Sequence, residues 1–392
     1  QTMHDWENHH VLQINREPAR AAFTPFSVRK GDCSMSLDGI WKFRWTPVPG
    51  ERIIDFYQTD FNDKDWKDFP VPANWEVNGY GTPIYVSAGY PFKIDPPRVM
   101  GEPKADYTTY KERNPVGQYR RTFVLPVGWE ADGQTFLRFE GVMSAFYVWI
   151  NGERVGYSQG SMEPSEFNVT KYLKSGENQI SLEVYRYSDG SYLEDQDFWR
   201  FSGIFRDVFL YAAPSAHVRD MRVIADYDGT NGIFSATLDI AGKCSVKSIL
   251  TDENGTVIAQ SNEKESVNWT IENSKPWSAE IPNLYTFTVI LTDEDGNEIE
   301  VSRTKVGFRR FELKNGIMCL NGKRIIFKGI NRHEFDAKTG RAITKEDMLF
   351  DIQFMKKNNI NAVRTCHYPN NSLWYQLCDA YGIYLIDETN LE

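Results

Sequence analysis

Short apolar and aromatic runs, separated by turn residues, occupy much of the first half of the chain. Examples are "GIWKFRW", "AFYVWI", "ERVGY" and "NQISLEVYRY". Runs of this length without helical periodicity are typical of strands that bury one face. Asn151-Gly152 lies between two of the runs and predicts a tight hairpin. We therefore predict an all-β sandwich of jelly-roll type for residues 27–214, preceded by an extended N-terminal segment over residues 1–26.

A second series of strand-like runs covers residues 215–309. It includes "GIFSATLDIAG" and "YTFTVILTDEDGNEIEV", with turns rich in acidic residues and glycine between the runs. Alternating strands over a segment of this size predict an immunoglobulin-like β-sandwich. No residue pattern in this segment points to chemistry.

The pattern changes in residues 310–392. "KRIIFKGI", "INAVRT" and "IYLID" read as buried strands, and "TKEDMLFDIQFMKKNN" and "SLWYQLCDAYG" read as the helices between them. Thr344 with Asp347 resembles a capping box, and Gly382 is a typical helix stop. The order β-α-β-α-β requires a parallel sheet. Because three strands cannot close a barrel, we predict the beginning of a (β/α)₈ barrel in a truncated chain.

Charge and hydropathy exclude some classes of function. The formal net charge is −10, with Asp+Glu 54 against Lys+Arg 44, so no basic surface is expected to bind nucleic acid. No apolar run approaches the roughly 18 residues of a membrane span, and the polar start "QTMHDWENHH" lacks a signal-peptide core. The compartment stays open between the cytoplasm and a bacterial periplasm.

The cysteines give little indication of a function. They are widely spaced and odd in number, and no two form a C-x-x-C motif: Cys33, Cys244, Cys319, Cys366 and Cys378. We therefore expect neither a disulfide framework nor a zinc site. Cys366 and His367 are adjacent on a predicted strand, where neighbouring side chains point to opposite faces, so a thiol–imidazole pair is not expected either.

Polar residues cluster where each strand of the predicted parallel sheet ends. The three clusters are Asn331, Arg332, His333 and Glu334; Arg364, His367 and Tyr368; and Asp387, Glu388, Asn390 and Glu392. Barrel enzymes carry their chemistry at these strand ends, so we predict an active-site mouth there. Two chemistries stay open: sugar hydrolysis by a pair of carboxylates, and hydrolysis assisted by a cation on Glu392, Asp387 and two histidines.

A second acidic cluster lies inside the first sandwich, in the stretch "YSDGSYLEDQDFWRFSG". Glu194, Asp195 and Asp197 lie close together, with Tyr192 and Trp199 beside them. The stretch is either a solvated acidic loop or a sugar-binding loop, in which carboxylates bind hydroxyls or a hard cation and an aromatic ring stacks on the sugar.

Several longer motifs resemble the β-galactosidases of glycoside hydrolase family 2. They include "GINRHEF", "NAVRTCHYPN", "WYQLCDAYGIYLIDETNLE", "SDGSYLEDQDFWRFSGIFRDV" and "VPANWEVNGYGTPIY", and the resemblance extends over nearly the whole chain. It implies a jelly-roll sugar-binding domain, an immunoglobulin-like domain and a (β/α)₈ catalytic barrel. It also implies retaining hydrolysis of β-galactosides such as lactose by two glutamates, assistance by Mg²⁺ and Na⁺, and a homo-oligomer.

The resemblance also implies roles for single residues. Asp197 would bind galactose and the sodium ion, and His333 and His367 would contact the sugar in the transition state. Arg364 would orient the nucleophilic carboxylate, and Glu392 would be a magnesium ligand. The acid/base and the nucleophile are expected beyond Glu392, so this chain alone is expected to be inactive.

Two features depart from the family pattern. Ser87 stands where relatives carry an asparagine that contacts substrate, and the segment 98–113 is longer than expected. Two other functions are considered: a carbohydrate-binding or assembly module, and a β-glucuronidase or β-mannosidase of the same family. The acidic loop around Asp197 favours galactose over glucuronate, because a carboxylated sugar would be better bound by basic groups.

Overall fold

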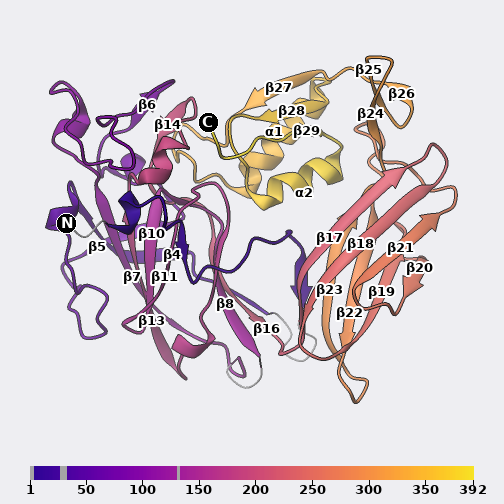
Figure 1. Ribbon diagram of the computed structural model, residues 1–392, viewed down its shortest axis with the longest axis horizontal. Helices are drawn as coiled ribbons and strands as arrows, with labels where there is room; N and C mark the ends of the chain where they lie inside the picture. The colour runs from indigo at the N-terminus through magenta and orange to yellow at the C-terminus, as the bar shows by residue number, and fades with distance from the viewer. Residues whose placement is uncertain (1–3, 27–32, 130–132) are drawn as a thin grey trace.

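Two β-sandwiches and a smaller α/β segment make up the chain (Figure 1). The computed structural model describes residues 4–26, 33–129 and 133–392. The predicted boundary at residue 27 falls outside these ranges, and the other predicted domain boundaries stay predictions. Within the described ranges, no helix is both long and apolar enough to cross a membrane.

The first sandwich packs a seven-stranded antiparallel sheet against a four-stranded one. The larger sheet has the order β1 (Gln13–Ile14), β11 (Glu153–Ser158), β10 (Ala145–Ile150), β13 (Glu177–Tyr185), β7 (Val116–Val124), β4 (Gly39–Thr46) and β5 (Lys67–Val71). The smaller sheet has the order β12 (Ser165–Asn168), β8 (Gln134–Phe139), β16 (Val208–Ala213) and β3 (Ser34–Ser36). Their facing side chains form one apolar core that includes Trp41, Tyr119 and Leu182.

Two short ribbons and six single-turn helices lie around this sandwich. The ribbons pair β14 (Phe198–Arg200) with β6 (Ile84–Val86), and β15 (Gly203–Ile204) with β9 (Val142–Met143). The 3₁₀ turns are η1 (Asp5–Glu7), η2 (Pro49–Glu51), η3 (Glu76–Asn78), η4 (Thr108–Tyr110), η5 (Thr170–Tyr172) and η6 (Asp189–Tyr192). The ribbon of β6 and β14 matters most, because it carries the loop residues of the candidate site.

The second sandwich has a three-stranded and a five-stranded sheet. The first has the order β17 (His217–Tyr227), β18 (Gly232–Ala241) and β21 (Ser266–Ile271). The second has the order β2 (Thr24–Phe26), β23 (Glu298–Val306), β22 (Tyr285–Thr292), β19 (Ser245–Thr251) and β20 (Val257–Ser261). Strand β2 comes from the N-terminal segment, which therefore adds one strand to each sandwich: β1 to the first and β2 to the second.

The C-terminal segment contains the predicted parallel sheet. Strands β27 (Gly329–Arg332), β28 (Ala362–Thr365) and β29 (Tyr384–Ile386) are parallel and adjacent, with helices α1 (Lys345–Lys357) and α2 (Ser372–Tyr381) between them in sequence. The prediction of one strand over "KRIIFKGI" is wrong. Its start, β26 (Lys323–Arg324), belongs to an antiparallel sheet with β24 (Phe311–Lys314) and β25 (Ile317–Leu320), and only its end joins the parallel sheet.

Local signals in the sequence explain where several elements begin and end. Thr344 and Asp347 form the predicted capping box at the start of α1. Gly382 adopts φ +76° at the end of α2, where a side chain would also collide with the Ala279 carbonyl. Asn151 and Gly152 both have positive φ between β10 and β11, as a type I′ hairpin requires. These three predictions are confirmed.

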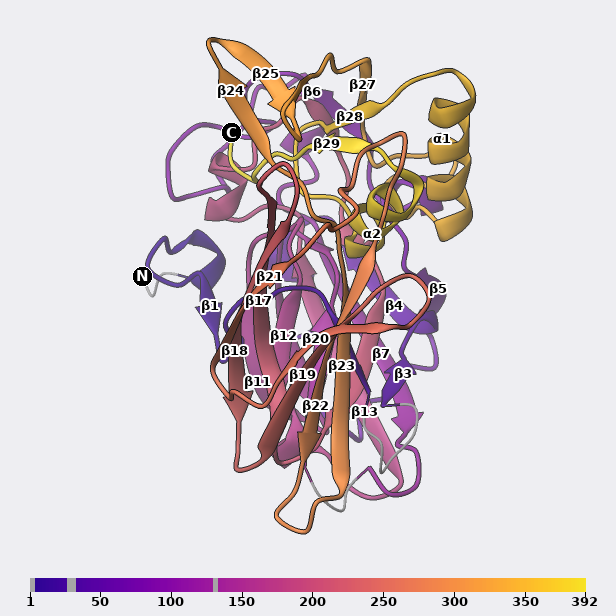
Figure 2. The same cartoon turned by 90° about the vertical axis from the view of Figure 1, so that its right-hand side faces the viewer.

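The α/β segment packs against both sandwiches (Figures 1 and 2). On the first sandwich, Phe198 and Phe205 share a buried cluster with Tyr368. On the second, Trp277 packs with Tyr384, and its indole N–H donates to the Asp379 carbonyl at 2.9 Å. These contacts hold the strand ends of the parallel sheet over one end of the jelly roll.

A buried ion pair joins the first sandwich to the α/β segment. Arg206 Nη2 lies 2.5 Å from Glu334 Oε2, and both side chains are at most 3% exposed. Arg206 also donates to the carbonyls of Met162 and Pro369, and the Asn371 amide donates to Glu334 Oε1. Every charge in the pair therefore has several partners, as burial requires.

We predict that Arg206→Leu lowers the free energy of unfolding by about 3–5 kcal/mol, because it leaves the Glu334 carboxylate buried without its counter-ion. Urea unfolding followed by tryptophan fluorescence measures this. Arg219→Leu is the matched control, since the Arg219–Glu17 pair is partly exposed, at 43% and 28%, and is worth at most about 1 kcal/mol. Equal effects of the two substitutions would contradict the role given to Arg206.

Candidate active site

The candidate site lies where the C-terminal residues meet a loop of the jelly roll. Asn390 Nδ2 donates to Glu194 Oε1 at 2.7 Å, and the Glu392 amide donates to the Leu193 carbonyl at 3.0 Å. Gln196 Nε2 donates to Asn390 Oδ1 at 3.1 Å. The polar cluster after β29 is therefore tied to the stretch that leads into Asp197.

The ribbon of β6 and β14 places Asp197 and Ser87 near each other. Val86 pairs with Phe198 in this ribbon, so Ser87 follows one strand where Asp197 precedes the other. The hydroxyl of Tyr85 donates to Asp197 Oδ1, and this bond raises the pKa of Tyr85. The phenol therefore stays protonated and orients the Asp197 carboxylate. Sequence reasoning missed Tyr85, although it lies in the quoted motif "GTPIY".

The other two acids of this loop have structural partners. Glu194 accepts hydrogen bonds from the Ser161 amide and hydroxyl, and Asp195 lies 2.6 Å from Arg200 Nη2. Burial raises the pKa of Glu194. Asp197 bonds to Tyr85, and the ring of Tyr85 also contacts the exposed ring of Trp199, with 5.6 Å between their centroids.

His333, His367 and Arg364 converge from the ends of β27 and β28. The two imidazole rings lie 5.4 Å apart between centroids, edge to face. Arg364 pairs with Glu388 through Nε, and Arg364 Nη2 lies 3.2 Å from His367 Nδ1. Glu388 Oε2 lies 3.3 Å from the same nitrogen. The predicted convergence of the strand ends is therefore confirmed for these residues.

The remaining carboxylates differ in their surroundings. Asp387 Oδ1 accepts hydrogen bonds from Thr365 at 3.0 Å and Tyr375 at 2.8 Å, so it is oriented within the sheet edge. Glu392 is exposed, and among the described residues no side chain bonds its carboxylate. Glu392 can therefore offer carboxylate oxygens that no described side chain bonds.

Arg341 packs beneath the site, and no pattern in the sequence predicted its role. Its guanidinium is buried between the rings of Phe198 and Tyr368, at 4.0 and 4.6 Å from their centroids. The pKa of His333 is lowered to about 4. Burial of part of its ring is the largest cause, and the nearby Arg341 cation and His367 add to it. His333 is therefore neutral near pH 7, although part of its ring is exposed.

Cys366 also faces this site. One ligand atom from each of His333, Cys366 and His367 lies within 4.8 Å of the others. The prediction that Cys366 and His367 point to opposite faces is wrong, because β28 ends at Thr365 and the alternation of a strand does not extend to them.

We predict that His333 titrates near pH 4 in the folded protein, well below its ordinary value of 6.5. The associated stability is complete above pH 6.5 and is lost as pH falls toward 4, because only the unfolded state gains a proton in that window. NMR titration of the imidazole protons measures the midpoint. Arg341→Met should move the midpoint part of the way back toward 6.5, whereas Arg341→Lys keeps the cation and should not. An ordinary midpoint in the unaltered protein would contradict this assignment.

Family comparisons match consecutive parts of the chain. Residues 34–214 match the sugar binding domain of glycosyl hydrolases family 2, residues 216–309 match a further domain of glycosyl hydrolases family 2, and residues 311–392 match its TIM barrel domain. The prediction that the parallel sheet begins a (β/α)₈ barrel is thus confirmed.

Similar proteins include two curated β-galactosidases. The one from Halalkalibacterium halodurans is 48% identical over 97% of this chain and 39% of its own length. The one from Clostridium acetobutylicum is 46% identical over 99% of this chain and 44% of its own length. The chain thus spans about two-fifths of the length of these relatives.

Solved structures support the fold. A β-glucuronidase from an uncultured Clostridium species superposes with a TM-score of 0.77 at 23% identity, over 94% of this chain and 61% of that one. A β-glycosidase from Bacteroides vulgatus superposes with a TM-score of 0.73 at 24% identity, over 91% of this chain and 44% of that one. The domain matches and the curated relatives show that the chain belongs to glycoside hydrolase family 2.

Proposed function

We propose that this chain is the N-terminal portion of a retaining β-galactosidase that hydrolyses terminal β-D-galactosides such as lactose. The observation that carries the proposal is the junction at which Asp197 of the jelly roll interacts electrostatically with His333 of the barrel segment, which lies beside His367 and, through it, Arg364. The names of the similar curated proteins agree with this substrate.

The described residues suit sugar binding better than bond cleavage. Asp197 accepts hydrogen bonds from sugar hydroxyls, with Tyr85 fixing its orientation. Neutral His333 can donate through one ring nitrogen and accept through the other. His367 is held by Arg364 and Glu388. Each can strengthen its contacts as charge develops on the sugar ring in the transition state.

The catalytic carboxylates are proposed to lie in barrel strands that follow Glu392. Retaining hydrolysis needs two carboxyl groups on opposite sides of the scissile bond, one of them free to attack. Glu388 is paired with Arg364, and Asp387 is held by Thr365 and Tyr375. The chain also spans only about two-fifths of the length of its curated relatives, so we expect the 392-residue chain to be inactive by itself.

Mg²⁺ and Na⁺ are proposed as ions of the whole enzyme, at Glu392 and Asp197. Both side chains offer the carboxylate oxygens that hard cations prefer. Glu392 has no competing partner, which fits a single Mg²⁺ ligand, and Asp197 keeps one oxygen besides the one that accepts from Tyr85. When bound, such ions supply positive charge that orients sugar and carboxylate oxygens. Assembly of the whole enzyme as a homo-oligomer stays a prediction.

A β-glucuronidase is the second candidate, favoured by the solved structures that share this fold. Those structures are less than 25% identical in sequence to this chain, so they support the fold and not the substrate. The loop around Asp197 is acidic, which disfavours a substrate carboxylate at that place. Ser87 can keep one hydrogen bond to the substrate but reaches less far than asparagine, so it tunes affinity in this proposal.

The test is hydrolysis of nitrophenyl glycosides with Mg²⁺ and Na⁺ present. The full-length protein that carries this chain should cleave the β-galactoside with kcat/KM about 100-fold or more above that for the β-glucuronide. The folded 392-residue chain should cleave neither. Preference for the glucuronide would contradict the proposal. Sugar binding without hydrolysis by the full-length protein would instead favour a carbohydrate-binding module.

Matched variants connect the activity to the structure. Asp197→Asn in the full-length protein removes a charged acceptor worth about 1.5–3 kcal/mol, so kcat/KM should fall about 10- to 150-fold. Asp239→Asn changes an exposed carboxylate on the second sandwich and should leave kcat/KM unchanged. An unchanged rate in Asp197→Asn would remove Asp197 from the site.

A further inference from the structure

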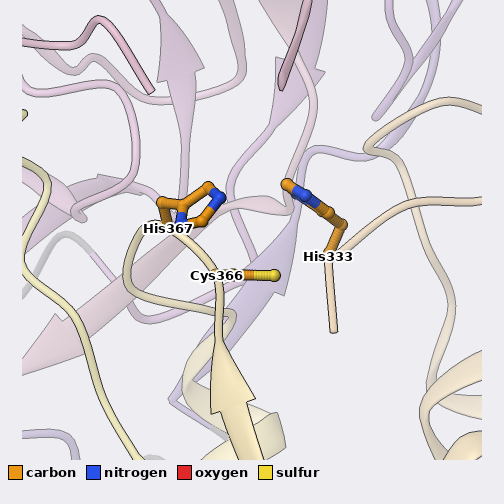
Figure 3. A group of neighbouring side chains, drawn as sticks. All are labelled: His333, Cys366 and His367. Atoms are coloured by element: carbon orange, nitrogen blue, oxygen red, sulfur yellow. The ribbon is translucent and has the colours of Figure 1, made fainter. Parts of the chain in front are cut away.

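Three soft or borderline ligand atoms meet beside the sugar-binding residues. His333, Cys366 and His367 each bring one potential metal ligand, all within 4.8 Å of one another. Figure 3 shows the Cys366 sulfur pointing toward His333, with the His367 ring on the other side of the group. Among the described residues, this is the one group of three or more potential ligands that meets such a distance limit.

The topology of the parallel sheet explains the cluster. Arg332 pairs with Thr365 in the ladder of β27 and β28. His333 and Cys366 are the residues that follow this pair, and His367 comes next. The three ligands therefore share one edge of the sheet, although His333 is more than thirty residues from the adjacent Cys366 and His367 in sequence. Ligand motifs defined by short spacing could not reveal this arrangement.

The ligand types suit a zinc-class cation. Imidazole nitrogen and thiolate sulfur bind Zn²⁺ tetrahedrally at about 2.0–2.1 and 2.3 Å, so neighbouring ligand atoms lie roughly 3.3–3.8 Å apart. The three ligand atoms lie within 4.8 Å of one another, so they must approach one another by about 1 Å to bind the ion. Small side-chain rotations supply this, and the exposed His333 ring leaves a path from solvent.

The charged neighbours act on a cation in both directions. Glu388 Oε2 lies 3.3 Å from His367 Nδ1, the position in which a carboxylate commonly orients a metal-binding imidazole and leaves Nε2 for the ion. Arg364 Nη2 lies 3.2 Å from the same nitrogen, but Arg364 is itself paired with Glu388. Around His333, Arg341 and Arg364 oppose a further positive charge and Asp197 favours it. Binding of an ion therefore depends on the bonds to the three ligand atoms and not on an excess of negative charge.

We propose that His333, Cys366 and His367 form a three-ligand site for Zn²⁺ or a similar borderline-soft divalent cation, with a fourth position open to water. Binding deprotonates the Cys366 thiol, the proton passes to solvent, and a zinc–sulfur bond forms. The site stands on the ligand geometry and not on the proposed hydrolytic function. If that function holds as well, the ion occupies the imidazoles that contact the sugar and acts as an inhibitor.

The experiment titrates the purified 392-residue chain with Co²⁺, a spectroscopic substitute for Zn²⁺. One equivalent should bind and give a thiolate-to-cobalt charge-transfer band in the near ultraviolet, and Zn²⁺ should abolish the band. Cys366→Ser should remove the band, whereas Cys244→Ser, in the second sandwich, should retain it. Glu388→Gln should weaken Zn²⁺ binding by about 10- to 100-fold.

Absence of the band in the unaltered chain, or its persistence in Cys366→Ser, would overturn the proposal. If Cys366→Ser fails to fold, X-ray absorption of the zinc-loaded unaltered chain decides. One sulfur at about 2.3 Å with two nitrogens near 2.0–2.1 Å supports the site, and a shell without sulfur overturns it. None of these measurements needs catalytic activity, so this inference and the hydrolytic proposal can fail separately.

Discussion

The ion pair between Arg206 and Glu334 is the constraint on which the site depends. Glu334 directly follows His333. Arg206 belongs to the jelly roll and lies just before β16, a strand whose residues Val208 and Leu210 are part of the jelly-roll core. Because the pair is buried and multiply hydrogen-bonded, it fixes the end of β27 relative to the first sandwich. Asp197 and His333 come from different domains, so their approach exists only while the domains stay docked.

Arginines recur along this domain junction. Arg200 holds Asp195 in the jelly-roll loop, Arg364 holds Glu388, and Arg341 is buried between Phe198 and Tyr368. Nε and Nη1 of Arg341 have no hydrogen-bond partner within the described chain, and the cation is stabilised by two aromatic faces, one carbonyl and the nearby Glu334 carboxylate. Burial of the His333 ring and this neighbouring cation together lower the pKa of His333. The electrostatics of the site thus follow from the packing of the junction.

The features predicted correctly from the sequence are those that depend on interactions between residues close together in the chain. The capping box at Thr344, the stop at Gly382 and the hairpin at Asn151-Gly152 each depend on a few neighbouring residues. The strand-end rule also identified His333, Arg364 and His367 as neighbours. Arg206 and Glu334 could not be paired in advance, because they are 128 positions apart and belong to different domains. Arg341 was missed for the same reason, since only the docked structure shows what it faces. Cys366 was considered, but strand alternation was wrongly extended past Thr365, where β28 ends.

Native-state hydrogen exchange of this chain tests the docking most directly. The amide of Arg341 donates across the junction to the side-chain oxygen of Asn74 in the jelly roll. If the barrel segment is docked as described, this amide exchanges as slowly as the helical amide of Ile352, which is buried in the segment's own core. Exchange as fast as that of the exposed turn at residues 252–256 would show that the junction opens freely, and would contradict the account.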